Sequence, residues 1–208
     1  MKISFVKLWI ISLWRLLKNN IRTIYFNSKQ YNQSLKATPA SRNYDIHNVH
    51  ILGELQDKNT KNYILAKQFK KNLWKINNLK QERINNLHKF SWLPHLDIKK
   101  DKELAKIIID AWLEKNNNYQ STTWDLLVLA NRIIFWITSP SLTIRHDDLI
   151  YRTKITNNIL KQCVHLSKNI THLHSKKDRI YALFSLILAG TTFEGYKKFT
   201  DSSIKILN

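Results

Sequence analysis

The sequence predicts an all-α protein on three observations. At 208 residues the chain is long enough to bury one hydrophobic core. Its 43% hydrophobic residues and seven tryptophans are typical of a folded chain and not of a disordered one. It contains only three glycines and three prolines, too few for the tight turns that a sandwich or barrel of short strands requires. We therefore expect a single helical domain over residues 1–208.

The N-terminal quarter predicts one long helix and a connecting region. Residues 2–26 carry apolar side chains at helical spacing, at Ile3, Val6, Ile10, Leu13 and Leu17. We interpret this segment as a helix that docks on the rest of the chain, in preference to a helix lying on a membrane surface. Periodicity is lost over 27–62, which is expected to be a connecting region. Helical character returns over 63–76 and 81–88, before a break at Leu93-Pro94.

Two of the following helices are predicted to be buried on one side only. Residues 101–115 begin at a potential cap, Asp101, and residues 147–170 begin at Asp147 and Asp148, whose charge suits a helix N-terminus. The expected stripe of the first is Leu104, Ile107, Ile108, Ala111 and Trp112; that of the second is Leu149, Ile155, Ile159, Cys163, Leu166 and Ile170.

Two other helices, over 121–139 and 179–189, are apolar on all sides and are predicted to be interior. The first is expected to begin at Ser121 or Thr122 and to end at Ser139-Pro140, and the second is expected to end at Gly190. Thr191 and Glu194 are expected to cap a last helix, which reaches Leu207. Helices that are apolar on one side thus alternate along the chain with helices that are apolar on all sides. A four-helix bundle would give every helix one stripe, so the alternation predicts a two-layer array of antiparallel helix pairs, as in α/α toroids and solenoids.

The charge and the single cysteine limit the expected partners. A formal net charge of +19 is typical of proteins that bind nucleic acid or another polyanion. However, 26 of the 34 basic residues are Lys, and they accompany 26 Ile and 21 Asn, residues whose codons are rich in A and T. Composition bias therefore explains much of the charge, and nucleic acid is not the expected partner. Cys163 has no other cysteine to pair with, which favours a reducing compartment.

The N-terminus predicts neither export nor a membrane span. Lys7 and Arg15 interrupt its apolar run, and no small-residue cleavage site follows, so we expect a cytoplasmic protein. The longest uncharged run, Leu8 to Trp14, is seven residues, against the roughly 20 that cross a bilayer.

The sequence names no catalytic residue, no metal ligand set and no cofactor. His165, His172 and His174 form the densest histidine group, but no carboxylate accompanies them. Neither a nucleophile elbow nor a Gly-rich phosphate loop is present. The tryptophans could stack on sugar rings or fill the core, and the core is the favoured interpretation. Trp92, in the turn FSWLPHL, and Trp124 are kept as candidate substrate-binding residues.

Four segments, in order, resemble alphaproteobacterial heparinase II/III family proteins. LHKFSWLPHL (87–96) resembles the family's Leu-His-x-Phe-x-Trp-Leu-Arg-Asp-Leu turn, with Pro94 and His95 in place of the Arg-Asp pair. AWLEKNNNYQSTTWDLLVLANRIIFWI (111–137) resembles its Trp-containing helix, with Arg132 at the Arg position, which makes Arg132 a further candidate substrate-binding residue. YRTKITNNILKQCVHL (151–166) and RIYALFSLILAG (179–190) complete the series.

The resemblance implies an incomplete α/α toroid and a reaction class. Family members cleave acidic polysaccharides by β-elimination, in a chain that continues with a β-sandwich-rich half. The residues that carry proton transfer have no counterparts here. The resemblance therefore implies a truncated lyase fragment, inactive on its own, with an anionic polysaccharide or a separately encoded C-terminal half as possible partners. The alternatives are a non-catalytic basic helical module that binds an anionic glycan or, less favoured, nucleic acid.

Overall fold

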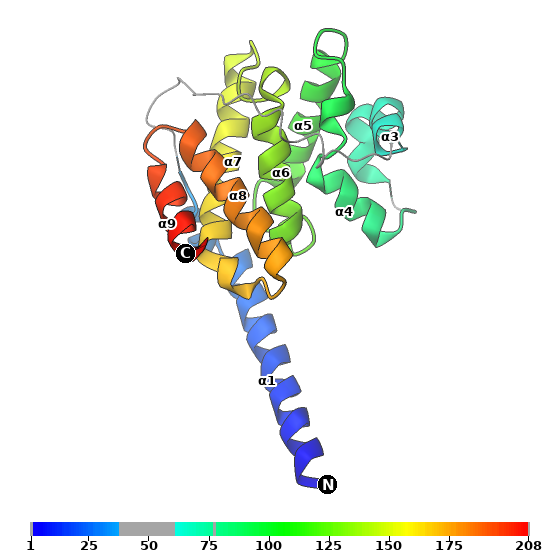
Figure 1. Ribbon diagram of the computed structural model, residues 1–208. Coiled ribbons are helices and arrows are strands. Elements are labelled where there is room, and N and C mark those ends of the chain that lie inside the picture. Colours follow the sequence, from blue (N-terminus) through cyan, green and yellow to red (C-terminus); the bar gives the residue numbers. More distant parts are fainter. Residues whose placement is uncertain (1, 38–60, 77, 208) are drawn as a thin grey trace.

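The computed structural model describes residues 2–37, 61–76 and 78–207, and every regular element in these ranges is helical (Figure 1). The predicted all-α class is therefore confirmed. The α-helices are α1 (Lys2–Asn27), α2 (Lys29–Ser34), α3 (Lys61–Phe69), α4 (Gln81–Lys89), α5 (Lys102–Asn116), α6 (Leu126–Thr138), α7 (Leu149–Asn169), α8 (Lys176–Thr192) and α9 (Lys197–Leu207).

Helix α6 lies at the centre of the helical body and packs against α4, α7 and α8. Nine of its residues are buried, on all sides of the helix, which confirms that it is interior. The expected start at Ser121 or Thr122 is wrong. The helix begins after Asp125, whose carboxylate accepts hydrogen bonds from the backbone N–H groups of Leu127 and Val128, both at 3.1 Å. Asp125 satisfies two of the N–H groups that the first turn leaves unpaired.

The two helices predicted to be buried on one side differ from the expectation. In α5 the buried face is turned by one residue, because Ala105 and Ile109 are buried whereas Ile107 is 45% exposed. Helix α7 is buried over a wider arc than a single stripe, although its first residue, Leu149, is exposed. Its buried residues include five polar ones, which are Thr156, Asn158, Gln162, His165 and Asn169. Hydrogen bonds to other segments let α7 bury Asn158, Gln162, His165 and Asn169, which an apolar pattern cannot predict.

Gly190 does not end α8, and Thr191 with Glu194 does not cap the last helix, so both predictions are wrong. Helix α8 continues to Thr192, and α9 begins at Lys197. Gly190 lies where α9 crosses α8. A Cβ atom there would lie 2.4 Å from Thr200 Oγ1 and 2.8 Å from Thr200 N. The glycine is therefore required for close helix packing and not for helix termination.

We expect Gly190→Ala to lower the free energy of unfolding by about 1–3 kcal/mol, because the new methyl group forces α9 away from α8. Urea denaturation would measure the change. Thr191→Ala on the adjacent, exposed position is the control and should change stability by less than about 0.5 kcal/mol. An unchanged stability in Gly190→Ala would show that α9 does not pack as described.

The connecting region predicted over 27–62 contains a helix at its start. Ser28 caps α2 by accepting a hydrogen bond from Tyr31 N at 3.1 Å. The ring of Tyr31 and the side chain of Leu35 are buried against the helical body. The remainder of the predicted connection, residues 38–60, lies outside the described residues.

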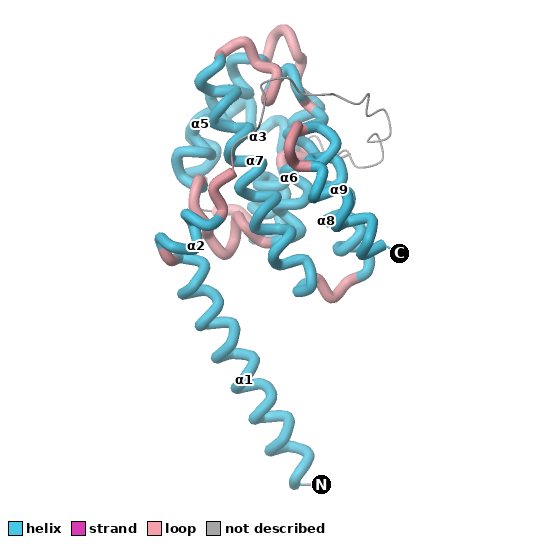
Figure 2. Tube along the Cα trace, turned by 90° about the vertical axis from the view of Figure 1, so that its left-hand side faces the viewer, coloured by secondary structure: helices cyan, strands magenta, loops and turns pink. Residues whose placement is uncertain are grey.

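Helix α1 projects away from the helical body in both views (Figures 1 and 2). Its last turns contact the body, where Phe26 is buried. The apolar residues Ile10, Leu13 and Leu17 are 55%, 43% and 47% exposed, so the predicted docking stripe is not docked. Within the described ranges, no helix combines the length and the hydrophobicity needed to cross a bilayer.

Candidate functional site

Two of the three candidate substrate-binding residues are buried tryptophans that hydrogen-bond to backbone. Trp92 is 0% exposed and its indole N–H donates to Leu87 O at 3.1 Å. Trp124 is 1% exposed and donates to Asn116 O at 3.0 Å. The favoured interpretation of these tryptophans as core residues is confirmed. Trp92 presents no open ring face on which a sugar could stack, and Trp124 lies in the wall of the pocket described below with only 1% of its surface exposed.

The third candidate, Arg132, is also fully buried, at 0% exposure. Its guanidinium lies 4.4 Å from the centroid of the Trp112 ring, an arrangement that favours a cation–π interaction. Its Nε donates to Gln162 Oε1 at 2.9 Å, and its Nη1 donates to His88 O at 3.0 Å. Burial lowers the pKa of the guanidinium. Among the described residues no carboxylate forms an ion pair with it, so aromatic faces and neutral oxygens stabilise this charge.

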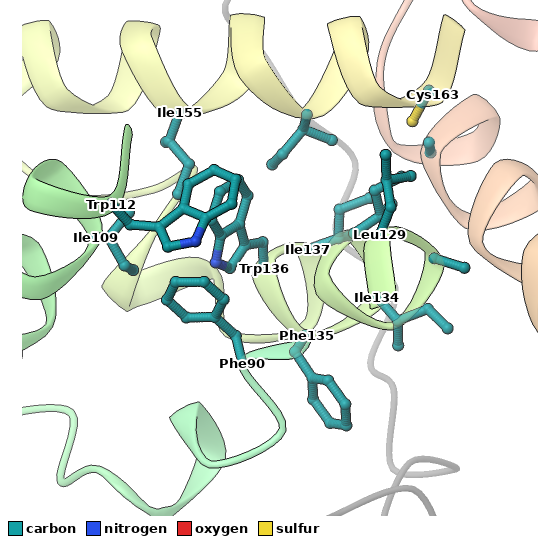
Figure 3. Close-up of a cluster of buried hydrophobic side chains, with 14 of the residues drawn as sticks. Phe90, Ile109, Trp112, Leu129, Ile134, Phe135, Trp136, Ile137, Ile155 and Cys163 are labelled. Carbon is teal, nitrogen blue, oxygen red and sulfur yellow. The ribbon is translucent and has the colours of Figure 1, made fainter. Parts of the chain in front are cut away.

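An aromatic cluster surrounds Arg132. Figure 3 shows Phe90, Trp112 and Trp136 lying close together beneath α7. The rings of Trp112 and Trp136 meet edge to face at 5.3 Å, and Phe90 meets Trp136 at 5.1 Å. The Trp112 indole donates to His88 Nδ1 at 2.9 Å. Arg132 therefore joins α6 to α4, α5 and α7 from inside the core, and it contacts no surface on which a polymer could lie.

A surface pocket of about 270 Å³ lies where the end of α1 meets the start of α6 and the end of α7. This volume is near the lower end for small-molecule sites, which is roughly 300 Å³. The pocket is lined by Arg22, Thr23, Phe26, Tyr119, Ser121, Trp124, Asp125, Leu126, His165, His172 and Leu173. We call it the Arg22 pocket. Two histidines of the group singled out in the sequence therefore contribute to one cavity.

A chain of hydrogen bonds connects Arg22 to the wall of this pocket. Arg22 Nη2 donates to Asn169 Oδ1 at 3.2 Å, and the amide nitrogen of Asn169 donates to the Tyr31 hydroxyl at 3.2 Å. Tyr31 Oη in turn lies 2.7 Å from His165 Nδ1. Because the phenol oxygen already accepts from Asn169, we assign its hydrogen to His165, which places the imidazole proton on Nε2. This network fixes the side chain of Arg22 relative to α7.

The ionisation of this network does not suit acid–base catalysis. Burial raises the pKa of Tyr31 to about 12, and burial together with Arg22 and Lys168 lowers the pKa of His165 to about 3. Near neutral pH the phenol is therefore protonated and the imidazole is neutral. The lone pair on His165 Nδ1 already accepts the Tyr31 hydrogen bond. A general base needs a pKa near the operating pH and a free lone pair, and neither group provides both.

The Arg22 pocket contains one cationic and one acidic side chain, Arg22 and Asp125. Arg22 Nε is buried and has no hydrogen-bond partner in the described part of the chain. The guanidinium also lies 4.9 Å above the Phe26 ring. Asp125 is the acidic residue in the lining, and its Oδ1 accepts two N–H groups at the start of α6. A ligand with a carboxylate or sulfate group could therefore pair with Arg22.

Sequence reasoning did not single out Arg22, Tyr31 or Asn169. Tyr31 and Asn169 are 138 positions apart, and Arg22 and Asn169 are 147 apart, so no local spacing connects them. The excess of basic residues was attributed to composition, which also concealed Arg22. Among the described residues no three His, Cys, Asp or Glu side chains are grouped as metal ligands.

Comparisons with protein-family models, with curated proteins and with solved structures find no match to this chain.

Proposed function

We propose that the helical unit is a non-catalytic module that binds an acidic saccharide at the Arg22 pocket. The observation that carries this proposal is the guanidinium of Arg22, which lines the pocket and is held there by its hydrogen bond to Asn169. A uronate or sulfate group in the pocket would accept a charge-assisted hydrogen bond from this guanidinium. The ring of Tyr119 in the same lining offers apolar surface to a sugar ring.

The acidic saccharide is favoured by the resemblance to heparinase II/III family proteins, which we propose as the origin of the chain. Under this proposal the helices correspond to part of the family's incomplete α/α toroid. The all-round burial of α6 supports that arrangement, whereas α8, which was also expected to be interior, leaves Ile180 58% exposed. The absence of cleavage is supported by the protonated Tyr31 and by the occupied lone pair of His165.

Titration calorimetry with heparin and alginate oligosaccharides tests this function. We expect Arg22→Gln to weaken binding by about tenfold or more, because it removes the charged donor and keeps an amide in its place. Lys29→Gln is the matched control, because it removes the same charge from an exposed position on α2, outside the pocket lining. It should change the affinity by less than about threefold.

Three outcomes would contradict the proposal. Equal losses of affinity in Arg22→Gln and Lys29→Gln would mean that the overall charge of the protein, and not the pocket, binds the ligand. Tighter binding of duplex DNA than of either saccharide, with a steep salt dependence, would favour the nucleic-acid alternative. Ultraviolet absorbance from unsaturated uronate, formed on incubation with the wild-type protein, would show that the module cleaves its ligand.

A further inference from the structure

The exposed surface of α1 is organised into an apolar stripe. Ile10, Leu13, Leu17, Ile21 and Ile24 follow one another at spacings of three or four residues, which places them on one side of the helix. Their exposed fractions are 55%, 43%, 47%, 67% and 73%, in that order. Trp9 and Trp14, at 66% and 69%, lie along its two borders by the same spacing. Contiguous apolar surface of this kind marks an interaction site.

The stripe faces away from the helical body. The part of α1 that contacts the body includes Phe26, which is buried, and Arg22, which lines the pocket. Ile21 and Ile24, in the same turns of the helix, are the most exposed members of the stripe. Figure 2 shows the helix leaving the body and continuing beyond it. The body therefore holds one end of α1, and the described part of the chain leaves the stripe uncovered.

The charge of α1 indicates what covers the stripe. Besides Arg22, which lies in the pocket, its sequence contains four basic residues, Lys2, Lys7, Arg15 and Lys18, and no acidic residue. A second copy of α1 packed on the stripe would bring two such helices together and oppose like charges. An anionic surface would instead be attracted by them. Tryptophan at the border of an apolar stripe is also typical of a helix at a membrane–water interface.

We propose that α1 lies in the surface of a bilayer that contains anionic phospholipid, with the stripe toward the acyl chains. A helix without tertiary contacts is marginally stable in water, so burial of the stripe stabilises α1 as well as attaching the protein. The helix lies along the surface and does not span it, since it lacks the apolar length for a span. The site is independent of the Arg22 pocket, whose ligand binding can succeed or fail separately.

Vesicle flotation tests the proposal with the full chain. We expect the protein to float with vesicles of equal parts phosphatidylcholine and phosphatidylglycerol, and to bind pure phosphatidylcholine vesicles at least about tenfold more weakly. Of the seven tryptophans only Trp9 and Trp14 are exposed, because each of the others is at most 9% exposed. Binding should therefore shift the emission of these two residues to shorter wavelength and protect them from acrylamide quenching.

A matched pair of variants locates the contact. Leu13→Asp places a charge within the stripe, whereas Ser12→Asp places the same charge on an exposed position outside it. Neither side chain is part of the buried core, so both variants should unfold like the wild type in urea. We expect Leu13→Asp to bind at least about tenfold more weakly than Ser12→Asp.

Several results would overturn the proposal. Equal affinity for the two vesicle types would remove the role of anionic lipid, and equal binding of the two variants would remove the role of the stripe. Self-association that Leu13→Asp abolishes, without vesicle binding by the wild type, would assign the stripe to a second copy of the chain.

Discussion

Between pH 7 and pH 5 the protein should lose on the order of 4 kcal/mol of stability, because two buried histidines resist protonation. Burial, with Arg132 and Lys115 nearby, lowers the pKa of His88 from 6.5 to about 3. The pKa of His165 is lowered equally far. At these two histidines the unfolded chain thus binds two more protons than the folded chain between about pH 6.5 and 3. The full stabilisation is present above about pH 6.5, and the free energy of unfolding falls as the pH decreases from there toward 3.

Urea denaturation as a function of pH would measure this loss. Below about pH 6 the free energy of unfolding should fall by about 2.7 kcal/mol per pH unit, or about 1.4 kcal/mol for each histidine. His165→Gln should reduce the slope to about half, while its amide oxygen still accepts from Tyr31. A slope that His165→Gln does not alter would mean that His165 is protonated in the folded protein.

Replacing Trp112 with Ala should lower the free energy of unfolding by about 3–5 kcal/mol. The substitution leaves a cavity next to Phe90 and Trp136. It also removes the ring over which the Arg132 guanidinium lies and the indole N–H that donates a hydrogen bond to His88 Nδ1. Chemical denaturation would measure the loss.

Trp14→Ala is the control for this substitution. It makes the same chemical change on α1, where Trp14 is 69% exposed, and should alter stability by less than about 0.5 kcal/mol. A loss below about 1 kcal/mol in Trp112→Ala would mean that the aromatic cluster does not hold Arg132 as described.

The sequence predicted the helices well where a strong apolar period coincided with a clear stop. The end of α6 at Ser139-Pro140 and the interior position of that helix were both correct. Among the helix starts, Asp101 and Asp148 do precede α5 and α7 as predicted. The predicted start of α6 was wrong, because several polar residues near its N-terminus can serve as caps and only the packed position of the helix selects one. Asp125 caps α6, although Ser121 and Thr122 are also cap residues by type.

Buried polar groups were the main features that the sequence did not reveal. Arg132 interrupts an apolar run, and such a residue normally marks a solvent-facing position, yet here it lies inside an aromatic cluster. Gly190 resembled a helix stop, but its missing side chain makes room for Thr200 of α9. Arg132 hydrogen-bonds to Gln162 and His88, 30 and 44 residues away, and Thr200 belongs to the next helix, so both outcomes depend on how the helices pack.

The sequence by itself determined the helical class, the interior position of α6 and the apolar stripe of α1, because each follows from the spacing of side chains along one helix. Only the tertiary structure decided that the described residues leave this stripe uncovered and that Arg22, Tyr31, His165 and Asn169 form one network. Burial and hydrogen bonding between segments more than 100 residues apart depend on how the helices pack, and helical spacing does not contain that information.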